Sequence, residues 1–367
     1  MERPIYVTRS SMPPFEEYCR EIAELWDSRM LSNDGVKHKQ FEQQLEDFLE
    51  TPHIQLFPNG HTALELAIKA LGLTGEVITT PFTFASTTLA ILRCGLTPVF
   101  CDIEDKHYTM NADKLKALIT DKTSAIIPVH VYGNICNYKK IKEIADKHGL
   151  KVIYDAAHTF GESVDGVNVS NLGDISMFSF HATKVFHTIE GGALSFSDKA
   201  LDGRLSALRK FGMNGSEDAE IIGTNAKMTE FAAAMGICNL RHFDEYILGR
   251  EQAFNRYRER LSDKKGIVLC PVQDNVKHNY AYFPVVFERE TFGAGRDEIA
   301  AKLAAENIFA RKYFYPLTSE FTAVKKICHP NETPVARRIA ENVLSLPLNA
   351  EMTPETVDTI CDIILSR

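Results

Sequence analysis

Between about residues 55 and 200, the chain alternates short apolar runs with segments whose apolar residues recur at helical spacing. The apolar runs predict strands at 76–84, 97–103, 123–133 and 150–157. The helical spacing predicts helices at 61–73, 86–95, 111–120 and 138–149. Strands that alternate with helices are typical of a parallel sheet covered on both faces. The pattern therefore predicts an α/β fold with a mostly parallel central sheet.

Two further apolar runs, "SMFSF" (176–180) and "GGALSF" (191–196), lie too close together for a helical crossover and predict an antiparallel pair. Residues 229–262 are helix-rich and predict one or two long helices. We expect these helices to link a large α/β domain over residues 1–240 to a smaller C-terminal α+β domain over 241–367.

Composition narrows the classes of protein that fit this pattern. The 367 residues are 44% hydrophobic and 25% charged, as in ordinary globular proteins. A net charge of −8 and a pI near 5.9 argue against a general nucleic-acid or membrane-surface partner. There is no apolar run of membrane-spanning length and no secretory signal, and the eight cysteines are scattered. We expect a cytoplasmic protein with reduced thiols.

Two residues carry the candidate chemistry. Lys184 lies between the two closely spaced apolar runs, and Asp155 ends the strand predicted at 150–157. A lysine there is either a solvated loop tip or a partly desolvated amine nucleophile. The aspartate either caps the next turn or lies at the carboxyl edge of the sheet, where ligands bind. Together they suit pyridoxal phosphate, which needs a lysine for its aldehyde and a carboxylate for its ring nitrogen.

The other groups that this cofactor needs have weaker candidates. The stretch "NGHT" (59–62) precedes an amphipathic helix, whose first turn could bind a phosphate through its N–H groups. Ordinary helix capping gives the same pattern. Ser179 could add a hydroxyl to that phosphate, and Phe84 could stack on the pyridine ring, although many strand-end phenylalanines belong to the core.

Several motifs occur in a characteristic order: "NGHTALELAIKAL", "IYDAAHTFG", "SFHATK" and "EGGALSF". With them, nearly the whole chain resembles the DegT/DnrJ/EryC1/StrS family of sugar aminotransferases, which are fold type I pyridoxal-phosphate enzymes. The resemblance implies that Lys184 forms a Schiff base with pyridoxal phosphate and moves the reacting proton, with pyridoxamine phosphate as an intermediate form. It further implies that Asp155 holds the ring nitrogen, that His158 neighbours the ring hydroxyl, and that Phe84 is the stacking aromatic.

The resemblance also implies how the phosphate and the substrate are bound. The amides of Gly60 and His61 and the hydroxyl of Ser179 would bind the phosphate. Asn225 matches an asparagine that reaches the cofactor of the neighbouring subunit, which implies a homodimer with shared active sites. Tyr315 could line the nucleotide-sugar cleft or pack in the core. No metal site is expected, because the histidines beside the lysine lack a third ligand.

The reaction implied by the resemblance is transfer of an amino group from L-glutamate to a nucleotide-linked keto sugar. "EGG" (190–192) and "RKYFYPL" (311–317) are most similar to members that act at C4. The predicted acceptor is dTDP-4-keto-6-deoxy-D-glucose, which gives dTDP-4-amino-4,6-dideoxy-D-glucose for O-antigen or other lipopolysaccharide biosynthesis. The alternatives are a 3-keto sugar or a UDP- or GDP-sugar as acceptor, and a non-catalytic sugar-binding sensor with the same fold.

Overall fold

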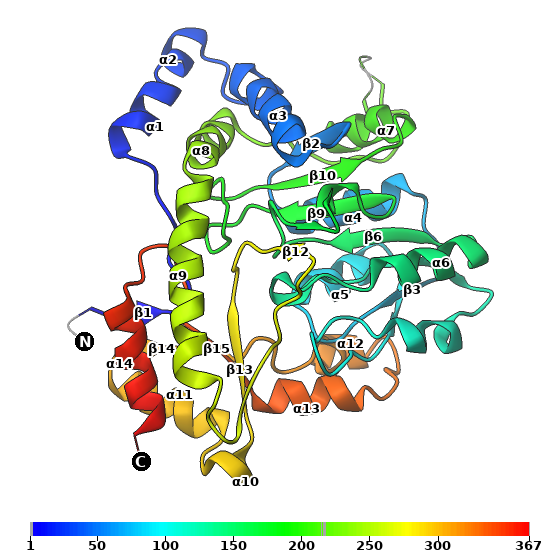
Figure 1. Cartoon of the computed structure of the whole chain (residues 1–367). Coiled ribbons are helices and arrows are strands. Elements are labelled where there is room, and N and C mark those ends of the chain that lie inside the picture. Colours follow the sequence, from blue (N-terminus) through cyan, green and yellow to red (C-terminus); the bar gives the residue numbers. More distant parts are fainter. Residues whose placement is uncertain (1–2, 214, 216–217, 367) are drawn as a thin grey trace.

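The computed structural model describes residues 3–213, 215 and 218–366, and a seven-stranded sheet lies at its centre (Figure 1). The strand order is β2 (His53–Phe57), β10 (Gly192–Phe196), β9 (Ile175–Ser179), β6 (Lys151–Asp155), β5 (Thr123–Ile126), β3 (Glu76–Thr79) and β4 (Thr97–Phe100). From β9 to β4 all neighbours are parallel, whereas β10 is antiparallel to both β9 and β2. The predicted α/β sheet and the predicted antiparallel pair are both confirmed.

Both faces of the sheet are covered because successive strand residues point to opposite sides. On β9, Met177 belongs to one apolar core and Phe178 to the other, and on β10 Leu194 and Ala193 divide in the same way. The Met177 core is built with α4 (Gly60–Ala70), α5 (Ala85–Arg93) and α7 (Ala200–Arg209). The Phe178 core is built with α3 (Val36–Leu49), α6 (Tyr138–His148) and α8 (Glu230–Arg241).

One predicted helix takes a different form. Residues 111–120 fold as the 3₁₀ helix η1 (Ala112–Leu118), although Asn111 caps it as expected by accepting a hydrogen bond from the Asp113 amide at 3.0 Å. The buried residues of η1, Ala112 and Leu115, are three positions apart. That spacing keeps them on one face of a 3₁₀ helix, which has three residues per turn.

Residues 229–262 were expected to form one or two long helices, and they form two, α8 and α9 (Phe243–Leu261). In Figure 1, α9 runs down one side of the molecule, from α8 to the C-terminal elements. Those elements include the antiparallel sheet β11 (Ile267–Leu269), β13 (Phe283–Phe287) and β15 (Val343–Leu346), with α11 (Arg296–Ala305) and α14 (Pro354–Leu365). The Phe178 core also contains Tyr282 and Phe314, so C-terminal residues pack directly on the large sheet. The division at residue 240 stays a prediction.

The remaining elements are short or peripheral. They are β1 (Ile5–Tyr6), α1 (Phe15–Ile22), α2 (Glu24–Ser28), η2 (Val131–Gly133), β7 (Ser163–Val164), β8 (Val167–Asn168), η3 (Val169–Asn171), β12 (Val276–Lys277), α10 (Arg289–Phe292), β14 (Ile308–Phe309), η4 (Thr318–Glu320), α12 (Thr322–Lys325) and α13 (Pro334–Asn342). β1 pairs with β14, which ties the N-terminal segment to the C-terminal part of the chain. Within the described residues, no helix is long and apolar enough to cross a bilayer.

Candidate active site

A cavity of about 520 Å³ lies where the carboxyl ends of β6 and β9 meet the N-termini of α4 and α5. Of the nine residues predicted from the sequence, seven line it: Gly60, His61, Phe84, Asp155, His158, Ser179 and Lys184. Asn225 and Tyr315 lie outside the lining of the cavity in this chain. The parallel sheet explains this convergence, because ligands collect at the carboxyl edge of such sheets.

The first turn of α4 forms the end of the cavity that suits an anion. Asn59 caps the helix by accepting a hydrogen bond from the Thr62 amide at 2.8 Å, so the capping interpretation also holds. A Cβ atom on Gly60 would lie 2.9 Å from the Cβ of Ser179, which shows how closely the helix terminus approaches β9. Helix N-termini carry partial positive charge and free N–H groups. This turn and the Ser179 hydroxyl can therefore hold a phosphate.

The side chain of His61 is held to one side of this turn. Its Nδ1 lies 2.9 Å from the Ser86 hydroxyl, and its Nε2 lies 3.0 Å from a carboxylate oxygen of Glu65. Both ring nitrogens therefore have protein partners. Any contact of His61 with a phosphate is left to its backbone N–H, as the sequence comparison with the family suggests.

Asp155 ends β6 and is 5% exposed. Its Oδ2 accepts a hydrogen bond from the Thr87 hydroxyl at 2.7 Å, and its Oδ1 accepts one from the Ala157 amide at 3.2 Å. The second bond is the turn cap considered from the sequence, and it coexists with a place in the cavity lining. Burial raises the pKa of Asp155, while the Thr87 and Ala157 bonds and the charge of Lys184 act in the opposite direction.

Lys184 lies in the loop between β9 and β10, and it lines the cavity rather than projecting as a solvated loop tip. Desolvation lowers the pKa of Lys184 from 10.5 to about 8, although Asp155 and Tyr313 partly oppose the shift. At pH 7 this change raises the neutral fraction of the amine about 300-fold. A neutral amine is the nucleophilic form of lysine, so the environment supports the second sequence interpretation.

His158 follows Asp155 on the same turn and is fixed in one protonation state. Its Nδ1 accepts a hydrogen bond from the Tyr132 amide at 3.0 Å, which leaves the ring proton on Nε2. Burial lowers the pKa of His158 well below its usual value, so the ring stays neutral. Tyr282 and Phe314 flank the ring, with centroids 4.7 and 6.0 Å away. His158 can thus donate one hydrogen bond through Nε2.

Together these groups fit pyridoxal phosphate. The cavity offers an amine of lowered pKa, a buried carboxylate, an anion-binding helix terminus and an aromatic ring, Phe84, at the start of α5. Phe84 is 60% exposed in the single chain, as a ring left to stack on a ligand would be.

Sequence reasoning missed four residues of the C-terminal part that line the cavity: Tyr282, Arg311, Tyr313 and Phe314. The expected residue, Tyr315, lies outside the lining, since its ring packs under the Arg296 guanidinium at 4.2 Å and is about half exposed. Tyr313 and Tyr315 both lie in "RKYFYPL", which belongs to neither a helix nor a strand. No regular periodicity therefore indicates which of the two faces the cavity. Asn225 is exposed, and its side-chain oxygen accepts a hydrogen bond from Lys227 at 2.6 Å.

The fold and this site define a class of enzyme that uses a lysine amine and a phosphorylated aldehyde cofactor. Residues 15–365 match the DegT/DnrJ/EryC1/StrS aminotransferase family, and the chain belongs to it. A dTDP-4-amino-4,6-dideoxy-D-glucose transaminase of Shigella dysenteriae is 41% identical over 364 residues, which are 99% of each chain. DesI, solved in the presence of its TDP-sugar product, superposes with a TM-score of 0.95 at 34% identity, covering 100% of this chain and 93% of DesI. A putative sugar aminotransferase of Streptococcus pneumoniae in its PLP form superposes with a TM-score of 0.91 at 25% identity, covering 98% of this chain and 97% of that one.

Proposed function

We propose that this aminotransferase uses pyridoxal phosphate to transfer an amino group from L-glutamate to C4 of dTDP-4-keto-6-deoxy-D-glucose. The observation that carries the chemistry is the placement of Lys184, Asp155 and the α4 terminus around one cavity. The acceptor is supported by the 41% identity to the Shigella dysenteriae transaminase over nearly the whole chain, and by the match to DesI.

Each residue of the site has a proposed part in this reaction. When bound, the cofactor supplies an electron sink for the carbanion that forms as the donor loses a proton. Lys184 Nζ removes that proton from the donor α-carbon and later returns one to the sugar carbon. The Asp155 carboxylate would keep a proton on the pyridine nitrogen, and His158 Nε2–H would donate a hydrogen bond to the ring hydroxyl. The α4 terminus and Ser179 anchor the phosphate.

The proposed acceptor is tested against the alternatives by direct assay. The purified protein, pyridoxal phosphate and L-glutamate are incubated in parallel with the dTDP-4-keto sugar, a 3-keto isomer, and UDP- and GDP-linked 4-keto sugars. We expect a new amine at C4 of the dTDP sugar, located by NMR and mass. Turnover with only a 3-keto, UDP or GDP substrate would replace the proposed acceptor. Absence of turnover with every one, despite cofactor binding, would favour the non-catalytic sensor.

Arg311 supplies a positive charge for the anionic substrates. It lines the cavity, and its guanidinium lies 5.6 Å from the Tyr313 ring centroid. The neighbouring cations Arg296 and Lys312 both contact Asp297, at 3.0 and 2.8 Å. Arg311 has no such ion pair among the residues that the structure describes. A cation without an acidic partner in a substrate cavity suits a carboxylate or a diphosphate.

We expect Arg311→Gln to raise the KM of at least one anionic substrate about 10- to 100-fold, since a hydrogen bond to a charged group contributes about 1.5–3 kcal/mol. Separate titration of L-glutamate and of the nucleotide sugar shows which anion Arg311 binds. Lys312→Gln is the matched control, because it removes the adjacent charge outside the cavity lining. Unchanged KM values for both substrates would remove Arg311 from the site.

We also propose that the chain forms a homodimer. Asn225, the residue expected to reach a neighbouring cofactor, is exposed and lies outside the cavity of its own chain. Large apolar side chains are exposed at the N-terminus and in the segment before α8: Phe15, Trp26, Met30, Leu31, Phe211, Met213 and Ile222. Such side chains favour burial against a second copy. Light scattering should give twice the chain mass of 41.2 kDa, whereas a monomer would contradict the proposal.

A further inference from the structure

The turn that carries His158 is held in place by a buried asparagine from the C-terminal part of the chain. Asn279 Nδ2 donates hydrogen bonds to the carbonyl of His158 at 2.9 Å and to the carbonyl of Phe160 at 3.1 Å. Asn279 is 2% exposed, so water does not replace these bonds when they are lost. The main chain of His158 is thus fixed by a residue 121 positions away in the sequence.

Glu162 lies against both segments that hold His158. Its Oε1 accepts a hydrogen bond from the backbone N–H of Asn279 at 3.0 Å. The Glu162 side chain is completely buried. On its other side, a Cβ atom on Gly133 would lie 2.9 Å from the same oxygen. Gly133 follows Tyr132, whose amide donates to the His158 ring. The carboxyl group therefore holds the main chain of Asn279 and lies close to Gly133, the residue after Tyr132.

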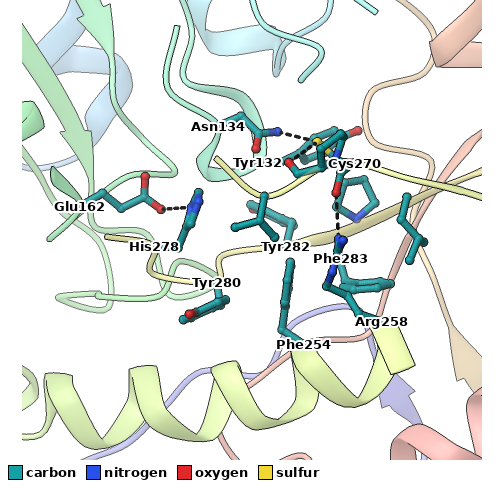
Figure 2. Close-up of a pocket in the computed structure, with 14 residues that line it drawn as sticks. Tyr132, Asn134, Glu162, Phe254, Arg258, Cys270, His278, Tyr280, Tyr282 and Phe283 are labelled. Carbon is teal, nitrogen blue, oxygen red and sulfur yellow. Dashed lines mark hydrogen bonds and ion pairs between the residues drawn. The ribbon is translucent and has the colours of Figure 1, made fainter. Parts of the chain in front are cut away.

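The surroundings of Glu162 disfavour its charged form. Figure 2 shows Glu162 facing His278, whose Nδ1 lies 3.9 Å from Oε1, which is too far for a hydrogen bond. Burial raises the pKa of Glu162 well above its usual value and lowers the pKa of His278, so burial favours the uncharged form of both side chains. Both line a cavity of about 30 Å³ that Tyr132 and Tyr282 also line. A glutamine has nearly the same shape and keeps the accepting oxygen.

We propose that Glu162 and Asn279 are positioning residues for His158, which fix its turn so that its Nε2–H remains available to the cofactor ring. The inference rests on the proposed function, and the two residues act only through His158. They do not line the 520 Å³ cavity themselves. The benefit is geometric, because a misplacement of about 1 Å at a reacting site can lower a rate about 10²-fold.

The proposal is tested with Glu162→Gln, Glu162→Asp and Asn279→Ser in the full-length, cofactor-loaded protein. We expect the Gln variant to behave as the wild type, since it keeps the acceptor without a charge. The Asp variant withdraws the carboxyl group, and the Ser variant removes the two carbonyl contacts. Both should lower kcat about tenfold or more, and both should shift the pH midpoint of the cofactor's visible absorption.

Two comparisons separate positioning from a merely structural role. Asn275→Ser is the matched control, because Asn275 lies in the same segment between β11 and β13, bonds Asp165 at 2.8 Å and is exposed. It should leave the midpoint unchanged. In a His158→Leu background, Glu162→Asp should cause little further shift, because the residue through which it acts is gone.

The proposal is overturned if Glu162→Asp and Asn279→Ser lower only the thermal stability while the midpoint stays at the wild-type value. It is also overturned if their effects add in full to that of His158→Leu. Failure of the proposed function is a separate result, because the wild-type protein would then show no amino transfer or no cofactor binding.

Discussion

Replacement of Lys184 by alanine should lower the rate of amino transfer about 10⁴-fold or more, because one side chain acts as nucleophile and as general acid and base. The structure supports this with an amine that lines the cavity and whose pKa is lowered to about 8. The variant should still bind the cofactor and the amino-sugar product, because the α4 terminus, Ser179 and Asp155 remain. The measurement is the kcat of transfer from L-glutamate to the keto sugar.

Lys142→Ala is the matched control for this variant, since Lys142 is an exposed lysine whose ion pair with Asp146 contributes little. The lowered pKa of Lys184 also predicts how the rate of cofactor uptake changes with pH. The rate at which the cofactor-free protein takes up pyridoxal phosphate should rise as the pH increases toward about 8 and then level off, as the neutral amine becomes the main form. A Lys184→Ala enzyme within tenfold of the wild-type rate would remove Lys184 from the mechanism.

Much of the fold follows from local patterns in the sequence. Strands such as β6 and β9 are apolar runs bounded by polar residues, and α6 ends at Gly149, whose φ of 66° is a left-handed conformation that favours glycine. The 3₁₀ form of η1 differs from the expected helix, and its buried residues Ala112 and Leu115 pack in a core built from distant parts of the chain. Packing against distant residues is not visible in a window of a few residues.

The candidate site likewise contains residues that the sequence predicts and residues that it does not. Asp155, Ser179 and Gly60 stand at ends of regular elements, so the parallel sheet brings them together once its strands are assigned. Arg311 and Tyr313 come from an irregular segment that reaches the cavity through tertiary packing. Glu162 and Asn279, which hold the turn of His158, are 117 positions apart in the sequence, and neither lies in a recognisable motif.

The charge of Asp155 should matter as much as its shape. Asp155→Asn keeps the size of the side chain, and its one carbonyl oxygen can still accept the Ala157 hydrogen bond while its NH2 group donates to the Thr87 hydroxyl. It cannot balance a protonated pyridine nitrogen. Loss of one preorganised electrostatic partner typically lowers kcat about 10²–10³-fold, and we expect a reduction of that size. The absorption spectrum of the bound cofactor should change in parallel, because the ring nitrogen loses its proton.

A second aspartate gives the control that separates this role from turn capping. Asp174 accepts hydrogen bonds from Lys151 and from the Val152 amide, both at 2.8 Å, and lies outside the cavity lining. Asp174→Asn should therefore lower stability without changing kcat or the cofactor spectrum. If Asp155 served only as a cap, both variants would lose stability and both would keep their activity.

A buried carboxylate whose pKa is raised by desolvation is costly to keep ionised, and a cationic ring beside it removes that cost. Asp155→Asn should accordingly bind pyridoxal phosphate more weakly than the wild type, whereas Asp174→Asn should bind it equally well.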